Sequence, residues 1–135
     1  MHVYIGGAYN GKRKFVMEKF KGDGHIHLYD GVLPELADFL PSDIVIVSRF
    51  ESIIANASLQ SEDQLVDSIM ERLLLINNCT TLICICTDIG RGIVPLDRQQ
   101  RFIRDTCGRL YQALFEKSST VTRIWYGLPQ VLKGE

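Results

Sequence analysis

The residues best placed to do chemistry lie near the N-terminus, where a short apolar run is followed by glycines and two basic residues. The segment after Val3-Tyr4-Ile5 matches the phosphate-binding pattern G-x-x-x-x-G-K, except that a basic residue replaces the closing Ser or Thr. Its residues are Gly6, Gly7, Ala8, Tyr9, Asn10, Gly11, Lys12 and Arg13. In such a loop, backbone N–H groups surround phosphates and the lysine reaches the outer ones. The pattern therefore predicts a nucleotide-binding site.

The last residue of this segment, Arg13, changes what the loop can hold. The hydroxyl that it replaces normally ligates Mg²⁺, whereas a guanidinium is a permanent cation that carries hydrogen-bond donors only. Arg13 can therefore grip a phosphate but cannot coordinate a metal. The alternative interpretation of the segment is a glycine-rich turn that joins a strand to a helix.

The elements that must position this loop follow from the alternation of apolar runs with segments of helical period. We expect strands at 3–5, 43–48, 80–86 and 121–126, and helices at 12–20, from the capping box at 61–64 onward, and at 98–117. Strands separated by helices of this length predict an α/β fold of the phosphate-loop NTPase type, with a mostly parallel sheet flanked by helices. The loop then lies at the carboxyl end of its strand, where such sheets bind ligands.

Length and composition favour a single domain that spans residues 1–135. The chain has 46% hydrophobic residues and a formal net charge of −1 at pH 7, which argues against a nucleic-acid or anionic-membrane surface spread over the whole protein. Its longest apolar runs are far too short to span a membrane, and the N-terminus has no signal-peptide pattern. We therefore expect a cytoplasmic protein.

The cysteines do not have the spacing of a zinc site. They are Cys79, Cys84, Cys86 and Cys107. Cys84 and Cys86 alternate within an apolar run and would share one face of a strand. We expect all of them to be reduced, buried thiols.

Further motif-like residues in the C-terminal half, together with the glycine loop, carry a family resemblance. They are Thr87 to Pro95, Arg104, Asp105, Gly108, Arg109, Gln112, Gly127, Leu128, Pro129 and Lys133. This set resembles the adenosylcobinamide kinase/adenosylcobinamide-phosphate guanylyltransferase family of cobalamin biosynthesis. The resemblance is dense toward the C-terminus, clear at the N-terminus and weak between them.

The resemblance implies a phosphate-loop protein that uses GTP or ATP, acts on a corrinoid and assembles as a homo-oligomer. Members of the family phosphorylate a hydroxyl of adenosylcobinamide and then transfer GMP from GTP through a guanylylated histidine. Carried over to this chain, Lys12 would hold the phosphates and Asp88 would be the remaining acid near the metal. The loop of Gly90, Arg91 and Gly92 would contact the substrate.

Three departures from the family pattern bear on this chemistry. Arg13 stands where the family has its metal-ligating serine, and Ser48 stands where it has an acid that helps to hold Mg²⁺. Together they remove most of the metal's protein anchors, so a bound Mg²⁺ remains possible but with degraded protein ligands. The chain is also shortened in the region that carries the guanylylated histidine. His25 and His27 remain there, and they are candidate nucleophiles, an H-x-H metal pair, or exposed histidines of a glycine-rich turn or strand.

These observations leave two main functional classes open. In the first, the protein is a nucleotide-dependent kinase and guanylyltransferase of corrinoid assembly. In the second, it is a catalytically impaired paralogue that binds nucleotide, corrinoid or a partner subunit without turnover. A small-molecule kinase of another phosphate-loop family is a third interpretation, and the Gly92-Ile93-Val94-Pro95 block counts against it.

Overall fold

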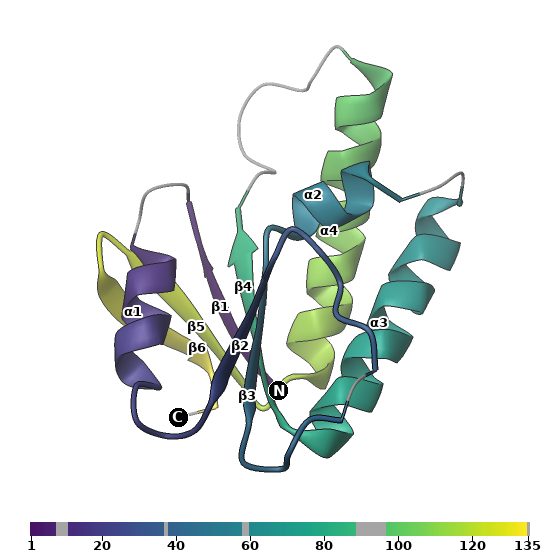
Figure 1. The fold of residues 1–135 in the computed structure, drawn as a ribbon. Helices are drawn as coiled ribbons and strands as arrows, with labels where there is room; N and C mark the ends of the chain where they lie inside the picture. Colours follow the sequence, from purple (N-terminus) through teal and green to yellow (C-terminus); the bar gives the residue numbers. More distant parts are fainter. Residues whose placement is uncertain (8–10, 37, 58–59, 89–96, 135) are drawn as a thin grey trace.

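A mostly parallel sheet with helices on both faces forms the centre of the protein (Figure 1). The structure is a computed structural model, and it describes residues 1–7, 11–36, 38–57, 60–88 and 97–134. The strands are β1 (His2–Gly6), β2 (Ile26–Asp30), β3 (Ile44–Ser48), β4 (Thr81–Thr87), β5 (Thr120–Trp125) and β6 (Leu128–Lys133). The helices are α1 (Lys12–Lys19), α2 (Phe50–Ala55), α3 (Glu62–Cys79) and α4 (Arg98–Lys117).

The strands lie in the order β2-β3-β4-β1-β5-β6. All neighbours are parallel except β5 and β6, which form an antiparallel hairpin at one edge. This arrangement confirms the predicted α/β fold with a mostly parallel sheet. Because β1 lies between β4 and β5, the glycine loop leaves the sheet from an interior strand.

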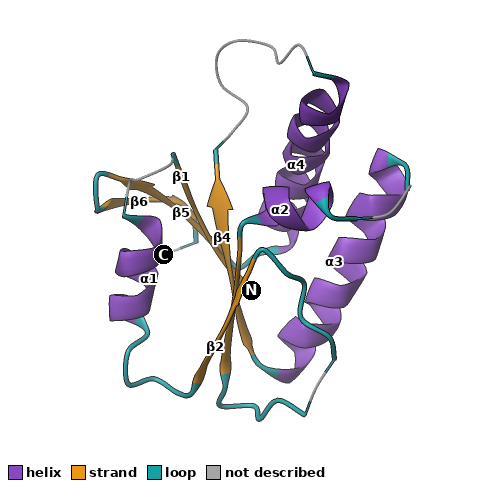
Figure 2. Ribbon diagram, turned by 45° about the horizontal axis from the view of Figure 1, so that its top comes forward, coloured by secondary structure: helices purple, strands orange, loops and turns teal. Residues whose placement is uncertain are grey.

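The helices divide into two layers. Figures 1 and 2 show α1 on one face of the sheet and α2, α3 and α4 on the other. The larger core lies under α2 to α4, and a smaller one, which includes Val16 and Ile124, lies under α1. Residues 44–47 of β3 are all buried, which confirms that this strand is covered on both faces, as parallel strands are.

The two long helices begin where local sequence signals place them. At the start of α3, the Ser61 side chain accepts a hydrogen bond from the Gln64 backbone N–H, while the Gln64 side chain accepts one from the Ser61 N–H. This reciprocal pair is the predicted capping box. Helix α4 has the predicted bounds, and the Asp97 carboxylate caps it by accepting a hydrogen bond from the Gln99 N–H.

Three short elements, β2, α2 and β6, were not predicted as such. For the region of β2 the sequence left a turn or a strand open. Tyr126 and Gly127 connect β5 to β6, and their φ values are positive, at 48° and 78° respectively. Two successive residues of this kind form the tight hairpin turn whose twist matches the flanking strands. Pro129 lies on β6 at the sheet edge, where a missing N–H donor is tolerated.

The prediction of buried cysteines is wrong for one of them. Cys84, Cys86 and Cys107 are buried, but Cys79 is exposed at the last residue of α3. The reason is geometric: the buried stripe of α3 runs through Leu73, Ile76 and Thr80, and Cys79 lies beside this stripe on the exposed side of the helix. The cysteines are free thiols, and no cluster of three or more metal-ligating side chains occurs in the described ranges.

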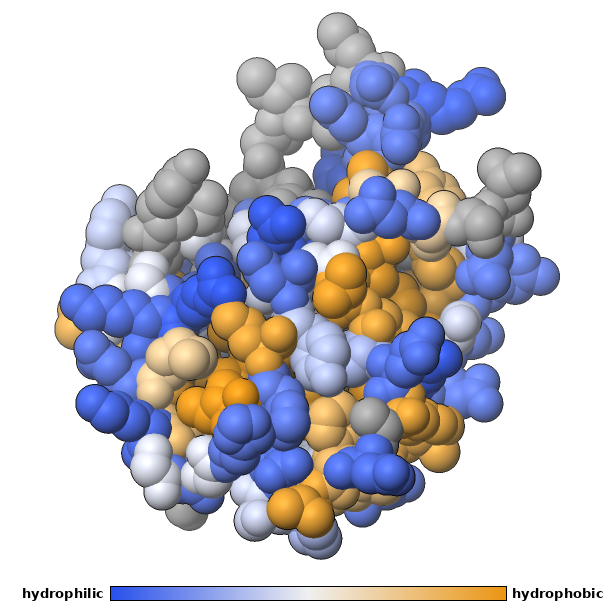
Figure 3. Space-filling view, viewed as in Figure 1, coloured by the Kyte–Doolittle hydropathy of each residue, from blue (hydrophilic) through white to orange (hydrophobic). Residues whose placement is uncertain are grey.

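The surface is mixed in polarity. Figure 3 shows hydrophilic residues around smaller groups of hydrophobic ones on the face that carries α1 and the front of α3. Among the exposed apolar side chains are Val32, Leu36 and Leu40, all from the segment that joins β2 to β3. No helix within the described residues is both long and apolar enough to cross a bilayer.

Candidate functional site

The described parts of the glycine loop have the geometry of a strand-to-helix junction at the carboxyl end of β1. Gly6 ends β1, and Gly11 is the N-cap of α1 with a left-handed φ of 79°. Ala8, Tyr9 and Asn10 lie outside the described residues. The first N–H groups of α1 have no partner within the helix, and they therefore give this junction the donors and positive potential that an anion requires.

Gly6 is required by its neighbours in the sheet. A Cβ atom at this position would collide with the backbone carbonyl of Ile124 on β5 and would touch the Lys12 side chain at 3.3 Å. The absence of a side chain therefore lets the strands pair and lets Lys12 fold back over the start of the loop.

Lys12 is held over the loop. It is only 9% exposed, and its Nζ donates a hydrogen bond to the Gly7 carbonyl at 2.8 Å. Burial lowers the pKa of the Lys12 ammonium, and the negative charge of Glu51 opposes this shift. A desolvated ammonium gains more from an incoming phosphate than an exposed one does, because the local dielectric is low.

Glu51 is a site residue that the sequence analysis did not identify. It lies in the first turn of α2, and its Oε2 atom is buried without a hydrogen-bond partner in the described part of the chain. A buried carboxylate oxygen without a hydrogen-bond partner is energetically unfavourable, and such atoms are rare in folded proteins. The sequence signal that could have identified Glu51 is its position three residues after Ser48. It was missed because α2, which contains it, was not predicted.

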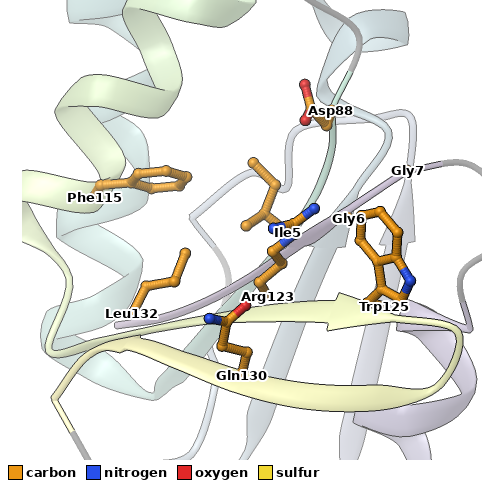
Figure 4. A pocket seen from close by; sticks show the side chains of 9 residues that line it. All are labelled: Ile5, Gly6, Gly7, Asp88, Phe115, Arg123, Trp125, Gln130 and Leu132. Carbon is orange, nitrogen blue, oxygen red and sulfur yellow. The ribbon is translucent and has the colours of Figure 1, made fainter. Parts of the chain in front are cut away.

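A pocket of about 370 Å³ borders the loop on the α4 face of the sheet. Its walls come from β1, from the β5–β6 hairpin and from α4, and Figure 4 shows Phe115, Gln130 and Leu132 directed into the same space. The remaining lining residues are Ile5, Gly6, Gly7, Asp88, Arg123 and Trp125. The pocket therefore lies between α4 and the β5–β6 hairpin, beside the end of β1.

The chemistry of this pocket combines aromatic, cationic and acidic groups. The Arg123 guanidinium lies 4.5 Å from the centre of the Trp125 ring, which is a cation–π contact. Asp88 lines the pocket, and its backbone N–H donates to the Gly6 carbonyl at 2.9 Å. Asp88, predicted as an acid of the site, is therefore next to the loop. Gly90, Arg91 and Gly92 lie outside the described residues.

The two residues that depart from the family pattern, Arg13 and Ser48, contact one carboxylate. Ser48 Oγ donates to Asp30 Oδ1 at 2.8 Å, and Arg13 Nη1 lies 3.8 Å from Asp30 Oδ2. A third group, Arg49 Nε, lies 3.2 Å from Oδ1. Sequence reasoning missed Asp30 and Arg49, because the strand pairing that brings Asp30 beside Ser48 is not encoded locally.

These contacts do not fit a protein-anchored Mg²⁺. Both oxygens of Asp30 already interact with donors or cations, and Arg13 has no lone pair to offer a metal. Mg²⁺ requires oxygen ligands at short distances in an octahedral arrangement. The contacts around Asp30 therefore do not supply such a ligand set.

The histidines lie away from the loop. His27 is the second residue of β2 and lies three steps along the strand from Asp30 at its carboxyl end, which at about 3.3 Å per step is about 10 Å. Its Nε2 lies 3.1 Å from Asp43 Oδ2, and its ring packs against those of His25 and Phe39. The Leu40 N–H and His27 together hold the pKa of Asp43 below its usual value. The structure therefore does not bring either histidine to the glycine loop.

Comparisons with known proteins point to the same family as the motifs. The family model of cobinamide kinase/cobinamide phosphate guanyltransferase matches residues 26–132, which is most of the chain and begins after the glycine loop. A curated protein from Pseudomonas aeruginosa, the bifunctional adenosylcobalamin biosynthesis protein CobP, is 41% identical over 54 residues. That match covers 40% of this chain and 31% of the relative, so it spans about a third of the relative's length.

Proposed function

Since the chain belongs to the cobinamide kinase/cobinamide phosphate guanyltransferase family, we propose that it is a nucleotide-dependent transferase that acts on a corrinoid. The glycine loop and Lys12 would hold the phosphates of GTP or ATP, and the pocket beside them would receive the part of the corrinoid that carries the acceptor hydroxyl. Asp88 would accept the proton of that hydroxyl. In the same proposal the protein is cytoplasmic and assembles from several copies.

The observation that carries this proposal is the position of the pocket. It shares Gly6 and Gly7 with the glycine loop and is also lined by Asp88. A donor phosphate on the loop and an acceptor in the pocket would therefore lie close together. Phosphoryl transfer depends mainly on such positioning and on cations that neutralise developing charge. Lys12 supplies one such cation.

Asp88→Asn provides the first test. We expect the wild-type protein to transfer the γ-phosphate of labelled GTP or ATP to adenosylcobinamide. Asp88→Asn should transfer it at least about 100-fold more slowly, as expected for loss of a general base. Nucleotide affinity should be nearly unchanged, because the carboxylate would face the acceptor. The measurement is single-turnover label transfer, and Asp105→Asn on the surface of α4 is the matched control.

A second candidate function is binding without turnover. It is favoured by the contacts of Asp30, which engage both residues that replace the family's metal anchors. If the wild-type protein binds nucleotide but transfers no label to the corrinoid under any metal condition, this second function replaces the first.

The guanylyl half of the family's chemistry is expected to be missing. A covalent intermediate requires an imidazole aligned with the α-phosphate, and His27 is instead paired with Asp43 near the start of β2. After incubation with α-labelled GTP, we expect intact-mass spectrometry to show no GMP adduct. An acid-labile adduct that disappears in His25→Ala or His27→Ala would refute this expectation and return the nucleophile to this segment.

A further inference from the structure

The strongest unassigned feature is the cluster around Asp30 at the carboxyl edge of the sheet. It brings together the last residues of β2 and β3, the residue that follows β3, and the second residue of α1. Asp30 and Ser48 are paired in register on neighbouring parallel strands, and Arg49 and Arg13 approach the same carboxylate. Arg13 directly follows Lys12, so the cluster adjoins the glycine loop.

The cluster is organised around the Asp30 carboxylate. Oδ1 accepts from Ser48 Oγ at 2.8 Å and lies 3.2 Å from Arg49 Nε, and Oδ2 lies 3.8 Å from Arg13 Nη1. The side chains of Arg13 and Arg49 are 52% and 58% exposed. Two guanidiniums thus share one carboxylate, which leaves one positive charge in excess and N–H groups accessible from solvent.

The backbone supports the placement of Arg49. Its φ and ψ are 55° and 56°, in the left-handed region that is unfavourable for a residue other than glycine. Gly31 leaves the space for its side chain, because a Cβ there would lie 3.2 Å from Arg49 Nη2. Strain of this kind persists where surrounding contacts over-determine a conformation, and it concentrates at ligand sites.

We propose that Arg13 and Arg49, positioned by Asp30, form a site for a phosphate group of the nucleotide and take the place of a protein-anchored Mg²⁺. The inference rests on the proposed binding of nucleotide at the glycine loop. Guanidiniums bind phosphate oxygens through paired N–H donors and carry a permanent charge. They neutralise phosphate charge without a metal.

The experiment compares Arg13→Ser with Lys14→Ser by calorimetric titration with GTP, in Mg²⁺ and in EDTA. Lys14 is an exposed neighbour on α1, so the control removes the same charge from the same helical turn. We expect the wild-type affinity to change less than about 3-fold between Mg²⁺ and EDTA. Arg13→Ser should bind about 10-fold more weakly in EDTA and recover in Mg²⁺, because the new hydroxyl can ligate the metal. Lys14→Ser should resemble the wild type.

Two results would overturn the inference. One is a wild-type affinity that falls 10-fold or more in EDTA, and the other is an Arg13→Ser variant that binds like Lys14→Ser under both conditions. Arg13→Lys keeps the charge but loses the paired donors, and it controls for an effect of the substitution on folding. Its GTP affinity in EDTA should lie between those of the wild type and Arg13→Ser. Pyrophosphate is titrated in parallel: Arg13-dependent pyrophosphate binding without GTP binding would contradict the proposed function alone.

Discussion

Replacing Lys12 with Met is expected to weaken GTP binding by about 10- to 100-fold. Hydrogen bonds to charged groups contribute about 1.5–3 kcal/mol each, and their loss converts to this range of affinity. Met keeps the length and apolar contacts of the side chain over Gly6 but removes the ammonium. The measurement is calorimetric titration with GTP, with Lys14→Met as the matched control on the exposed side of α1.

The same substitution should leave the free protein at least as stable as the wild type. Burial disfavours the charged form of Lys12, as its lowered pKa indicates, so an apolar side chain fits this position without a desolvation cost. Thermal unfolding without nucleotide tests this. Loss of binding together with retained stability would identify Lys12 as a residue kept for function. Equal GTP affinity in Lys12→Met and Lys14→Met would show that the loop does not hold the nucleotide.

Gly6→Ala should destabilise the protein by about 3 kcal/mol, a typical cost of forcing extra volume into a packed interior. The new Cβ would collide with the Ile124 carbonyl, which belongs to the backbone of β5 and cannot rotate away. β1 lies in the middle of the sheet, so moving it would disturb its pairing with both β4 and β5. The free energy of unfolding in urea measures the effect.

Gly108→Ala is the control for this substitution. Gly108 is an exposed position within α4 where a Cβ would meet no atom within 4 Å. Alanine should therefore stabilise the protein by about 0.5–1 kcal/mol through its higher helix propensity. If the free energy of unfolding of Gly6→Ala is within about 1 kcal/mol of the wild-type value, β1 and β5 do not approach each other as closely as the structure shows.

Elements with a strong local pattern could be predicted from the sequence. The capping box and the apolar stripe place α3, the period of the C-terminal helix places α4, and the continuous apolar run at 44–47 identifies a strand buried on both faces. α2 could not be predicted in this way, because it is only six residues long and begins at a left-handed Arg49 rather than at a side-chain cap. β6 is exposed along its length and has no apolar alternation to reveal it.

The candidate site divides in the same manner. The sequence by itself determined the strand that precedes the glycine loop and the helix that begins at Lys12, because each is a run of adjacent residues whose types specify their own conformation. Only the tertiary structure decided that Arg13, Ser48 and Arg49 meet at Asp30, that Glu51 buries an oxygen near the loop, and that His27 pairs with Asp43 instead of reaching the loop. These contacts join residues far apart in the chain, and their geometry depends on strand order and register, which are set by the packing of the whole sheet.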